Sequence, residues 1–111
     1  MTIYQPGDIV LLSFPFTEGT QSKNRPALIV LDTGDEDVVL ARITTQNYQT
    51  TYDYQVKYWQ ESGLLAPSTI RLHKIATVDK SLINRPLGKL NTSDREQVFS
   101  MIHKIYQNIV T

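Results

Sequence analysis

Short apolar runs that end at turns or prolines constrain the fold of this chain more than any other feature. In the first half of the chain they cover residues 9–14, 27–31 and 38–44, lengths that are typical of β-strands rather than helices. Pro15 ends the first run, because proline cannot continue a central ladder. The tight acidic turn 32–37 separates the other two runs, so we expect them to pair as a hairpin.

An Arg25–Pro26 step joins a polar loop to the second apolar run. Pro26 lacks a backbone N–H and belongs at the first residue or the edge of a strand, and it restricts Arg25 to extended geometry. We therefore expect the strand to begin at Pro26, with residues 15–25 forming a long loop of the kind that is often functional. Taken alone, this arginine is better explained as a surface residue at a strand start.

The second half of the chain alternates less regularly. Aromatic residues of one parity predict a strand at 52–59, and a cleaner alternation predicts another at 68–78. Apolar residues of both parities late in the second run indicate either a bulge or burial on both faces. We expect one helical turn at 79–83 and a short final strand at 85–90.

The last segment of the chain is predicted to be a helix. Ser93 and Glu96 have the spacing of a capping box, which satisfies free amides at a helix start. Five apolar residues then recur at helical spacing and form one stripe: Val98, Met101, Ile102, Ile105 and Ile109. Many short strands and one terminal helix predict a mainly β (β+α) fold in one domain, 1–111, a small curved barrel with the helix on its core.

Composition excludes several classes of protein and of site. The chain has no cysteine and a formal net charge of zero, so disulfides and thiolate metal sites are excluded and a broad basic surface is absent. An anion site must therefore be local. No apolar run approaches the roughly 20 residues that span a bilayer, and no signal peptide begins the chain, so we expect a cytoplasmic protein without membrane contact. His73 and His103 lie in no metal-ligand pattern, and we expect no metal and no cofactor.

Two polar residues of the 68–78 run suggest a phosphate site. Arg71 and His73 are two residues apart and project to the same side of their predicted strand. A guanidinium offers a fork of donors to a phosphoryl group, and an imidazole exchanges protons near neutral pH. Paired polar residues on an exposed strand face are common, and from the spacing alone they are the better explanation.

Four blocks of the sequence together resemble the PemK/MazF family of type II toxin–antitoxin toxins. One combination is fairly specific for this family: Gly7–Asp8 near the start, followed by Arg25–Pro26 with Leu28 and Val30 after it. The order and spacing of the blocks match across nearly the whole chain. They cover residues 7–10 with 14–17, 23–30, 41–46, and 67–80 with 85–88.

The resemblance implies an SH3-like barrel with a C-terminal helix that forms a homodimer. It also implies a metal-independent endoribonuclease that cuts single-stranded RNA, with a cognate antitoxin as partner and DNA binding among the family's properties. Arg25 and Thr44 match active-site positions of the family, and Arg71 matches a catalytic arginine of some members. His73 departs from the pattern, because those members carry an acid there; histidine could still transfer the protons.

The same resemblance places RNA contacts around these four residues. The loop before Arg25 is expected to gate the RNA groove and to be a region that antitoxin obstructs. Unpaired bases are expected to stack near Tyr48, Tyr52 and Tyr54 or on Phe16, although core packing explains most of these rings. The expected RNA-binding residues are Phe16, Thr17, Lys23, Thr45, Gln46 and Ser68.

Two other functions remain open from the sequence. One is a non-catalytic SH3-like module that binds RNA or a protein partner, which the histidine at position 73 would suit. The other is a barrel without any role in nucleic-acid binding, which the net charge of zero permits.

Overall fold

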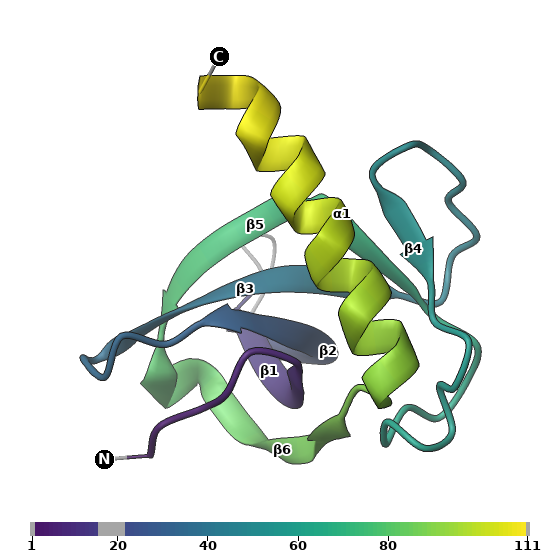
Figure 1. Ribbon diagram of the computed structural model, residues 1–111. Helices are drawn as coiled ribbons and strands as arrows, with labels where there is room; N and C mark the ends of the chain where they lie inside the picture. Colours follow the sequence, from purple (N-terminus) through teal and green to yellow (C-terminus); the bar gives the residue numbers. More distant parts are fainter. Residues whose placement is uncertain (1, 16–21, 111) are drawn as a thin grey trace.

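The computed structural model describes residues 2–15 and 22–110 as one bent antiparallel sheet crossed by a long helix (Figure 1). The sheet has six strands in the order β4-β5-β3-β2-β1-β6. The expected mainly β fold with a C-terminal helix is confirmed. The elements are β1 (Asp8–Pro15), β2 (Ser22–Leu31), β3 (Asp37–Thr44), β4 (Asp53–Gln55), β5 (Thr69–Asp79), the 3₁₀ turn η1 (Lys80–Leu82), β6 (Ile83–Lys89) and α1 (Thr92–Val110).

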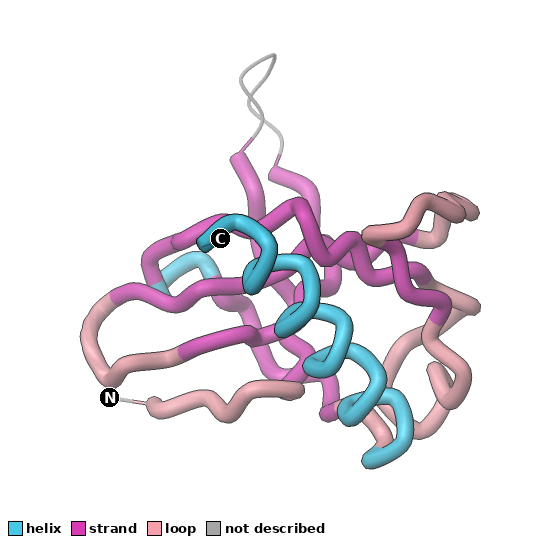
Figure 2. The backbone as a smooth tube through the Cα atoms, turned by 45° about the horizontal axis from the view of Figure 1, so that its top comes forward, coloured by secondary structure: helices cyan, strands magenta, loops and turns pink. Residues whose placement is uncertain are grey.

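Apolar side chains form a core on each face of the sheet. The first core lies under α1, where Val98 is fully buried among strand residues such as Leu28 and Ile70, and Figure 2 shows α1 running across the strands. The second core lies on the opposite face, around Leu12 and Ile29, with the residues that follow β5 packed against it. One face of the sheet is therefore covered by the helix, and the ends of the other face are left for polar residues.

A bulge bends the longest strand, β5. Its pairing with β3 shifts between Ala41↔Ile75 and Arg42↔Arg71, which leaves three residues of β5, 72–74, without a partner of their own on β3. A bulge of this kind bends a strand and re-aims its side chains. The irregular pattern of the 68–78 run therefore arises from a bulge.

The second strand begins earlier than its proline predicts. β2 starts at Ser22, so the expected start at Pro26 was wrong, and the expected loop was wrong at residue 15 and at residues 22–25, which belong to strands. β2 pairs with β1 on both sides of Pro26, whereas its pairing with β3 begins only at Ala27. Proline is accommodated because the β3 side of β2 is still an edge at that point. The expected gate falls largely on residues 16–21, which lie outside the described residues.

The expected strand 52–59 was wrong for most of its length, since β4 has three residues. The cause is a buried carboxylate at the start of α1. Asp94 is fully buried and accepts the backbone N–H groups of Lys57 at 3.0 Å and Tyr58 at 2.9 Å. It also accepts the Tyr54 hydroxyl, and burial together with this carboxylate raises the pKa of Tyr54. The backbone at Lys57 and Tyr58 is thus bonded to the helix rather than to a strand.

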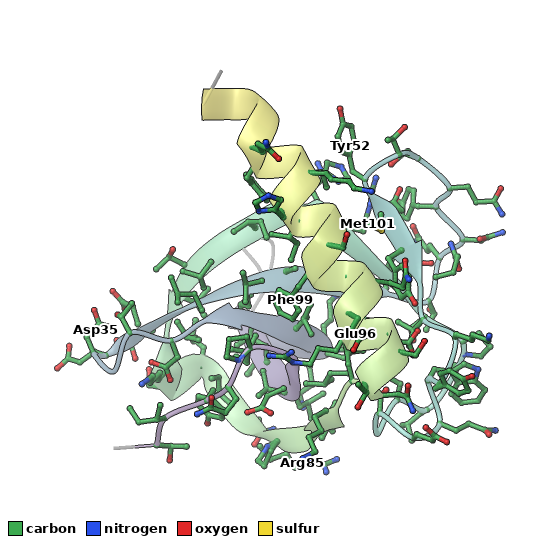
Figure 3. All side chains as sticks on the ribbon, in the orientation of Figure 1. Asp35, Tyr52, Arg85, Glu96, Phe99 and Met101 are labelled. Atoms are coloured by element: carbon green, nitrogen blue, oxygen red, sulfur yellow. The ribbon has the colours of Figure 1, made fainter. Side chains whose placement is uncertain are left out.

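The helix starts at a different cap from the expected one. The side chain of Asn91 accepts the N–H of Ser93 at 2.8 Å, and its carbonyl accepts the N–H of Arg95 at 2.8 Å. Asn91 is therefore the N-cap, and the capping box of Ser93 with Glu96 was wrong. Figure 3 shows Phe99 and Met101 on this helix, and both pack against the first core.

The apolar stripe of the helix is confirmed where its side chains are described. Val98, Met101, Ile102 and Ile105 all pack in the first core, whereas the side chain of Ile109 lies outside the described residues. Across residues 2–15 and 22–110, no helix is both long and apolar enough to cross a bilayer.

Candidate active site

Two rows of directly opposed residues cross the sheet on the face turned away from α1. Alternation places Arg25 on the side of Ala27 and Ile29, which belong to the second core. The outer row contains Leu12, Arg25, Thr44, Thr69 and Gln55. The inner row contains Val10, Ala27, Arg42, Arg71 and Asp53. Arg25 belongs to the outer row through its pair with Leu12; on the β3 side it is unpaired, two residues beyond Ala27↔Arg42.

Thr44 lies in the outer row, and its hydroxyl donates no hydrogen bond within the described part of the chain. The residue is 5% exposed, and its Oγ1 accepts the N–H of Gln46 at 3.2 Å. A hydroxyl that accepts one bond keeps its own hydrogen for another acceptor. Thr44 is paired with Thr69 of β5 at this end of the sheet, and Arg25 lies on β2 two residues beyond the last β2–β3 pair.

Arg71 is fixed in the inner row by an ion pair and an aromatic ring. Its Nε donates to Oδ1 of Asp53 at 2.9 Å, and the two side chains are 11% and 0% exposed. Its guanidinium carbon lies 3.7 Å from the centre of the Tyr48 ring, a close cation–π contact. Burial opposes ionisation of Asp53, but hydrogen bonds from Thr50 and Arg71 outweigh burial and hold the pKa of Asp53 below its usual value.

His73 lies beside Arg71 in the bulge of β5. Its Nε2 is 3.4 Å from Nη2 of Arg71. Because a guanidinium has only donors, a hydrogen bond across this contact requires the lone pair on Nε2 and the hydrogen on Nδ1. The Nδ1 atom is buried and has no hydrogen-bond partner among the described residues. The exposed ring of Tyr52 lies against the imidazole, with ring centres 5.3 Å apart, and Figure 3 labels Tyr52 near β4.

The structure therefore brings the four expected catalytic residues to one face, from three different strands. Two members of the inner row were missed by the sequence analysis. Arg42 is exposed and has no ion pair or side-chain hydrogen bond among the described residues; its separation from Thr44 by two residues on a predicted strand was a usable signal. Asp53 gave no such signal, because its role depends on the pairing of β4 with β5.

The expected RNA contacts before β2 cannot be placed. Phe16 and Thr17 lie outside the described residues. The backbone of Lys23 pairs with that of Phe14 at the start of β2, but the side chain of Lys23 is also outside the described part of the chain.

The expected RNA contacts after the strands have contrasting environments. Thr45 and Gln46 are exposed directly after β3, next to Thr44. Ser68 is 5% exposed, and its hydroxyl donates to the carbonyl of Ala66 at 2.8 Å. Thr45 and Gln46 are therefore open to a ligand, while the side chain of Ser68 is already bonded within its own loop.

The three tyrosines expected to stack on bases also differ. Tyr54 bonds to Asp94 below α1, and Tyr48 covers one face of Arg71. Tyr52 is 46% exposed and is the member of this trio with a free ring surface. In residues 2–15 and 22–110, no three histidine, aspartate or glutamate side chains come together in a way that could hold a metal ion.

Known proteins share both the sequence pattern and the fold. A family model described as "PemK-like, MazF-like toxin of type II toxin-antitoxin system" matches residues 5–106. No curated protein sequence matches the chain significantly.

Solved structures with the same fold have low sequence identity. MazF in the MazE–MazF complex from Deinococcus radiodurans superposes with a TM-score of 0.77 at 12% identity, over 96% of this chain and 98% of that one. An endoribonuclease from a mycobacterial species gives 0.74 at 17% identity, over 96% and 94%. Mycobacterium tuberculosis toxin MazF-mt6 gives 0.73 at 21% identity, over 90% and 96%.

At these identities the solved structures show the shared fold, whereas the family model shows the family, because it spans most of the chain. The family expected from the four sequence blocks is confirmed. This chain belongs to the PemK-like, MazF-like toxins of type II toxin–antitoxin systems.

Proposed function

We propose that this toxin is an endoribonuclease that cuts single-stranded RNA without a metal ion. One observation carries the proposal: three arginines, a threonine hydroxyl and a histidine share one sheet face in a chain whose net charge is zero. An anion site in a chain without net charge must be local, and this cluster meets that requirement. Structural relatives described as endoribonucleases support the same activity.

The proposed reaction uses a nucleophile that the RNA itself carries. The 2′-oxygen attacks the adjacent phosphorus, the new O–P bond forms, and the bond from phosphorus to the 5′-oxygen breaks. The products are a 2′,3′-cyclic phosphate and a free 5′-hydroxyl. Because the nucleophile is held next to the phosphorus by the sugar, proximity is supplied by the substrate.

Charge on the non-bridging oxygens is stabilised from the outer row. Arg25 donates to one oxygen, and the free hydrogen of the Thr44 hydroxyl is available for the same phosphate. Donors fixed in advance at the developing charge are among the largest contributions to catalysis. Arg42, exposed in the inner row, holds a flanking phosphate.

Proton transfer is assigned to His73. Its Nε2 lone pair accepts the 2′-hydroxyl proton, and the resulting imidazolium returns a proton to the departing 5′-oxygen. In the free protein, this lone pair faces Nη2 of Arg71. When a phosphate oxygen replaces Nε2 as the acceptor of the Nη2–H hydrogen bond, the Nε2 lone pair of His73 becomes free. Substrate binding and activation of the base are therefore coupled.

Cleavage in EDTA tests the proposal. The wild type is expected to cut RNA in EDTA, and Arg25→Ala is expected to lose about 100-fold or more of the rate, the usual effect of removing an oxyanion donor. Cleavage that EDTA abolishes but that Arg25→Ala retains would overturn the scheme.

We also propose a cognate antitoxin and a second copy of the chain as partners, acting in the cytoplasm where RNA is present. The relatives support the antitoxin, since one solved structure is a MazE–MazF complex and another is an endoribonuclease with its cognate antitoxin. The product of an adjacent small reading frame is expected to co-purify with the toxin and to stop cleavage. Failure of every neighbouring product to bind contradicts this part of the proposal.

A non-catalytic binding module is the second candidate, and one observation favours it. Arg71 is already paired with Asp53 and faces His73, so this pair is engaged within the protein before any substrate arrives. Under this alternative, purified protein binds RNA tightly and releases it intact.

A further inference from the structure

We propose that Asp53, the first residue of β4, is a positioning residue that orients Arg71 toward the RNA phosphate. The inference rests on the proposed function, since it assigns a role within that site. Asp53 does not touch the reacting atoms; it acts through the guanidinium of Arg71.

The carboxylate of Asp53 is held in place by contacts other than the one with Arg71. Its Oδ2 accepts the hydroxyl of Thr50 at 2.6 Å and the backbone N–H of Thr50 at 3.1 Å. The backbone N–H of Asp53 in turn donates to the Thr50 carbonyl at 3.1 Å. One carboxylate oxygen is thus fixed to the turn before β4, which leaves Oδ1 for Nε of Arg71.

Three contacts then fix the plane of the Arg71 guanidinium. The Nε–H points at Asp53, the ring of Tyr48 covers one face, and Nη2 lies beside Nε2 of His73. Nη1 has no hydrogen-bond partner among the described residues and is not buried, and the side chain keeps 11% of its surface exposed. An N–H group held in this way suits a charge-assisted hydrogen bond to a phosphate oxygen.

The charge of Asp53 also makes this arginine tolerable where it lies. Arg71 is directly opposite Arg42 on β3, and like charges in that relation destabilise a sheet. Asp53 lies on the other side of Arg71, opposite it on β4. The carboxylate of Asp53 neutralises the charge of Arg71 and fixes its guanidinium, while the exposed charge of Arg42 is left unpaired.

The chain contains a matched ion pair that serves as a control. Nζ of Lys80 lies 2.9 Å from Oδ1 of Asp32, and these side chains are 11% and 0% exposed, the same values as for Arg71 and Asp53. Asp32 follows β2 and Lys80 belongs to η1, away from both rows. Substituting each aspartate by asparagine removes one equivalent carboxylate, in the site or outside it.

The first measurement compares steady-state RNA cleavage by Asp53→Asn and Asp32→Asn. Asp53→Asn is expected to lower kcat by about 10- to 100-fold, because a misplaced group of this kind costs up to about 100-fold. Its KM is expected to change less than about 3-fold, since Arg25 and Arg42 still bind phosphates. Asp32→Asn is expected to keep kcat within about 2-fold of the wild type, whatever its stability.

The second measurement asks whether Asp53 acts only through Arg71. If it does, the double variant Asp53→Asn/Arg71→Ala cuts no more slowly than Arg71→Ala alone, since residues acting as a unit are non-additive. A purely structural role of Asp53 makes the two losses multiply. In the control double variant Asp32→Asn/Arg71→Ala, the effects of the two single substitutions on kcat are expected to multiply, because the two sites are independent.

The third measurement is spectroscopic and does not depend on activity. The Nε–H of Arg71 is bonded to a buried carboxylate, so its NMR signal is expected to exchange slowly with water in the wild type and in Asp32→Asn. The signal is expected to be lost in Asp53→Asn. If Asp53→Asn fails to fold, Thr50→Val replaces it, because Thr50 is exposed and holds only the far oxygen of Asp53.

The outcomes separate this inference from the proposed function. A wild type that cuts RNA, with Asp53→Asn or Thr50→Val cutting equally well, overturns the role of Asp53 and leaves the nuclease intact. Multiplying losses in the double variant also overturn it. A wild type that binds but never cuts RNA overturns the proposed function, and this inference with it.

Discussion

Two arginines of the inner row differ in whether their charge is already paired within the protein. Arg71 is compensated by Asp53 at 2.9 Å, whereas Arg42 is exposed directly opposite Arg71 without a partner of its own in the described part of the chain. An exposed cation of this kind adds little to stability. Its contribution is therefore expected in the binding of a phosphate.

Replacing Arg42 tests this difference. Arg42→Ala is expected to weaken RNA binding and to reduce the slope of log K against log salt by about 0.7, because one phosphate contact on a single strand is lost. Fluorescence titrations at several salt concentrations measure the slope. Arg85→Ala is the control, since Arg85 is an exposed arginine of β6 at the opposite edge of the sheet from β4 (Figure 3). Equal slopes for wild type and Arg42→Ala contradict the assignment.

At the scale of elements, the β6 strand and the turn after β4 depend on a contact between two glycines. Gly63 has a φ of +85°, and a Cβ there would lie 2.1 Å from the carbonyl oxygen of Leu87. A Cβ on Gly88 would lie 2.4 Å from the carbonyl oxygen of Ser62. Backbone is in contact with backbone at this point, so no side chain can be accommodated.

Gly63→Ala is therefore expected to lower the free energy of unfolding by about 2 kcal/mol or more, from strain and from the clash together. Gly34→Ala is the control, because Gly34 also has a positive φ of +92° but its nearest atom would be 3.6 Å away. It is expected to cost about 1 kcal/mol. Urea unfolding compares the two, and equal losses would show that the close contact is unimportant.

The sequence predicted those elements whose residues determine their own structure. β1, β3 and α1 follow from apolar runs and from a helical stripe that packs on the core. The start of β2 and the length of β4 could not be predicted, because pairing with β1 extends the first and the distant Asp94 ends the second. The N-cap was misplaced because Asn91 and Ser93 are both good capping residues, and the sequence alone does not choose between them.

The candidate site divides in the same way. Arg25, Thr44, Arg71 and His73 were accessible from alternation and from the resemblance to the family. Asp53 was not, because its contact with Arg71 exists only after β4 pairs with β5.

At the scale of the whole molecule, buried or hydrogen-bonded carboxylates make stability depend on pH. Burial opposes ionisation of Asp32 and Asp53, but backbone and side-chain hydrogen bonds outweigh it, and the pKa of each is lowered. The pKa of Asp79 is lowered by hydrogen bonds from Ser81. A lowered folded-state pKa adds stability that is complete above the unfolded value near 4 and is lost as pH falls through the folded value.

These three carboxylates are therefore expected to make a constant contribution to the thermal unfolding midpoint from about pH 7 to about pH 5. Their contribution is expected to fall below about pH 4, and the protein loses stability there. Asp53→Asn and Asp32→Asn should each make this acid decline shallower, since each removes one of the groups that must be protonated. Thermal unfolding from pH 3 to pH 7 checks the slope. A decline that is as steep in both variants as in the wild type contradicts the linkage.

The chemistry of the cut ends tests the central claim most directly, because only attack by the 2′-oxygen produces a cyclic phosphate. Single-stranded RNA is incubated with the wild-type toxin in EDTA, and the fragments are measured by mass spectrometry. The proposed reaction at the two rows predicts fragments that end in a 2′,3′-cyclic phosphate and begin with a 5′-hydroxyl. Fragments that carry a 5′-phosphate and a 3′-hydroxyl, or RNA that stays intact, would contradict the account.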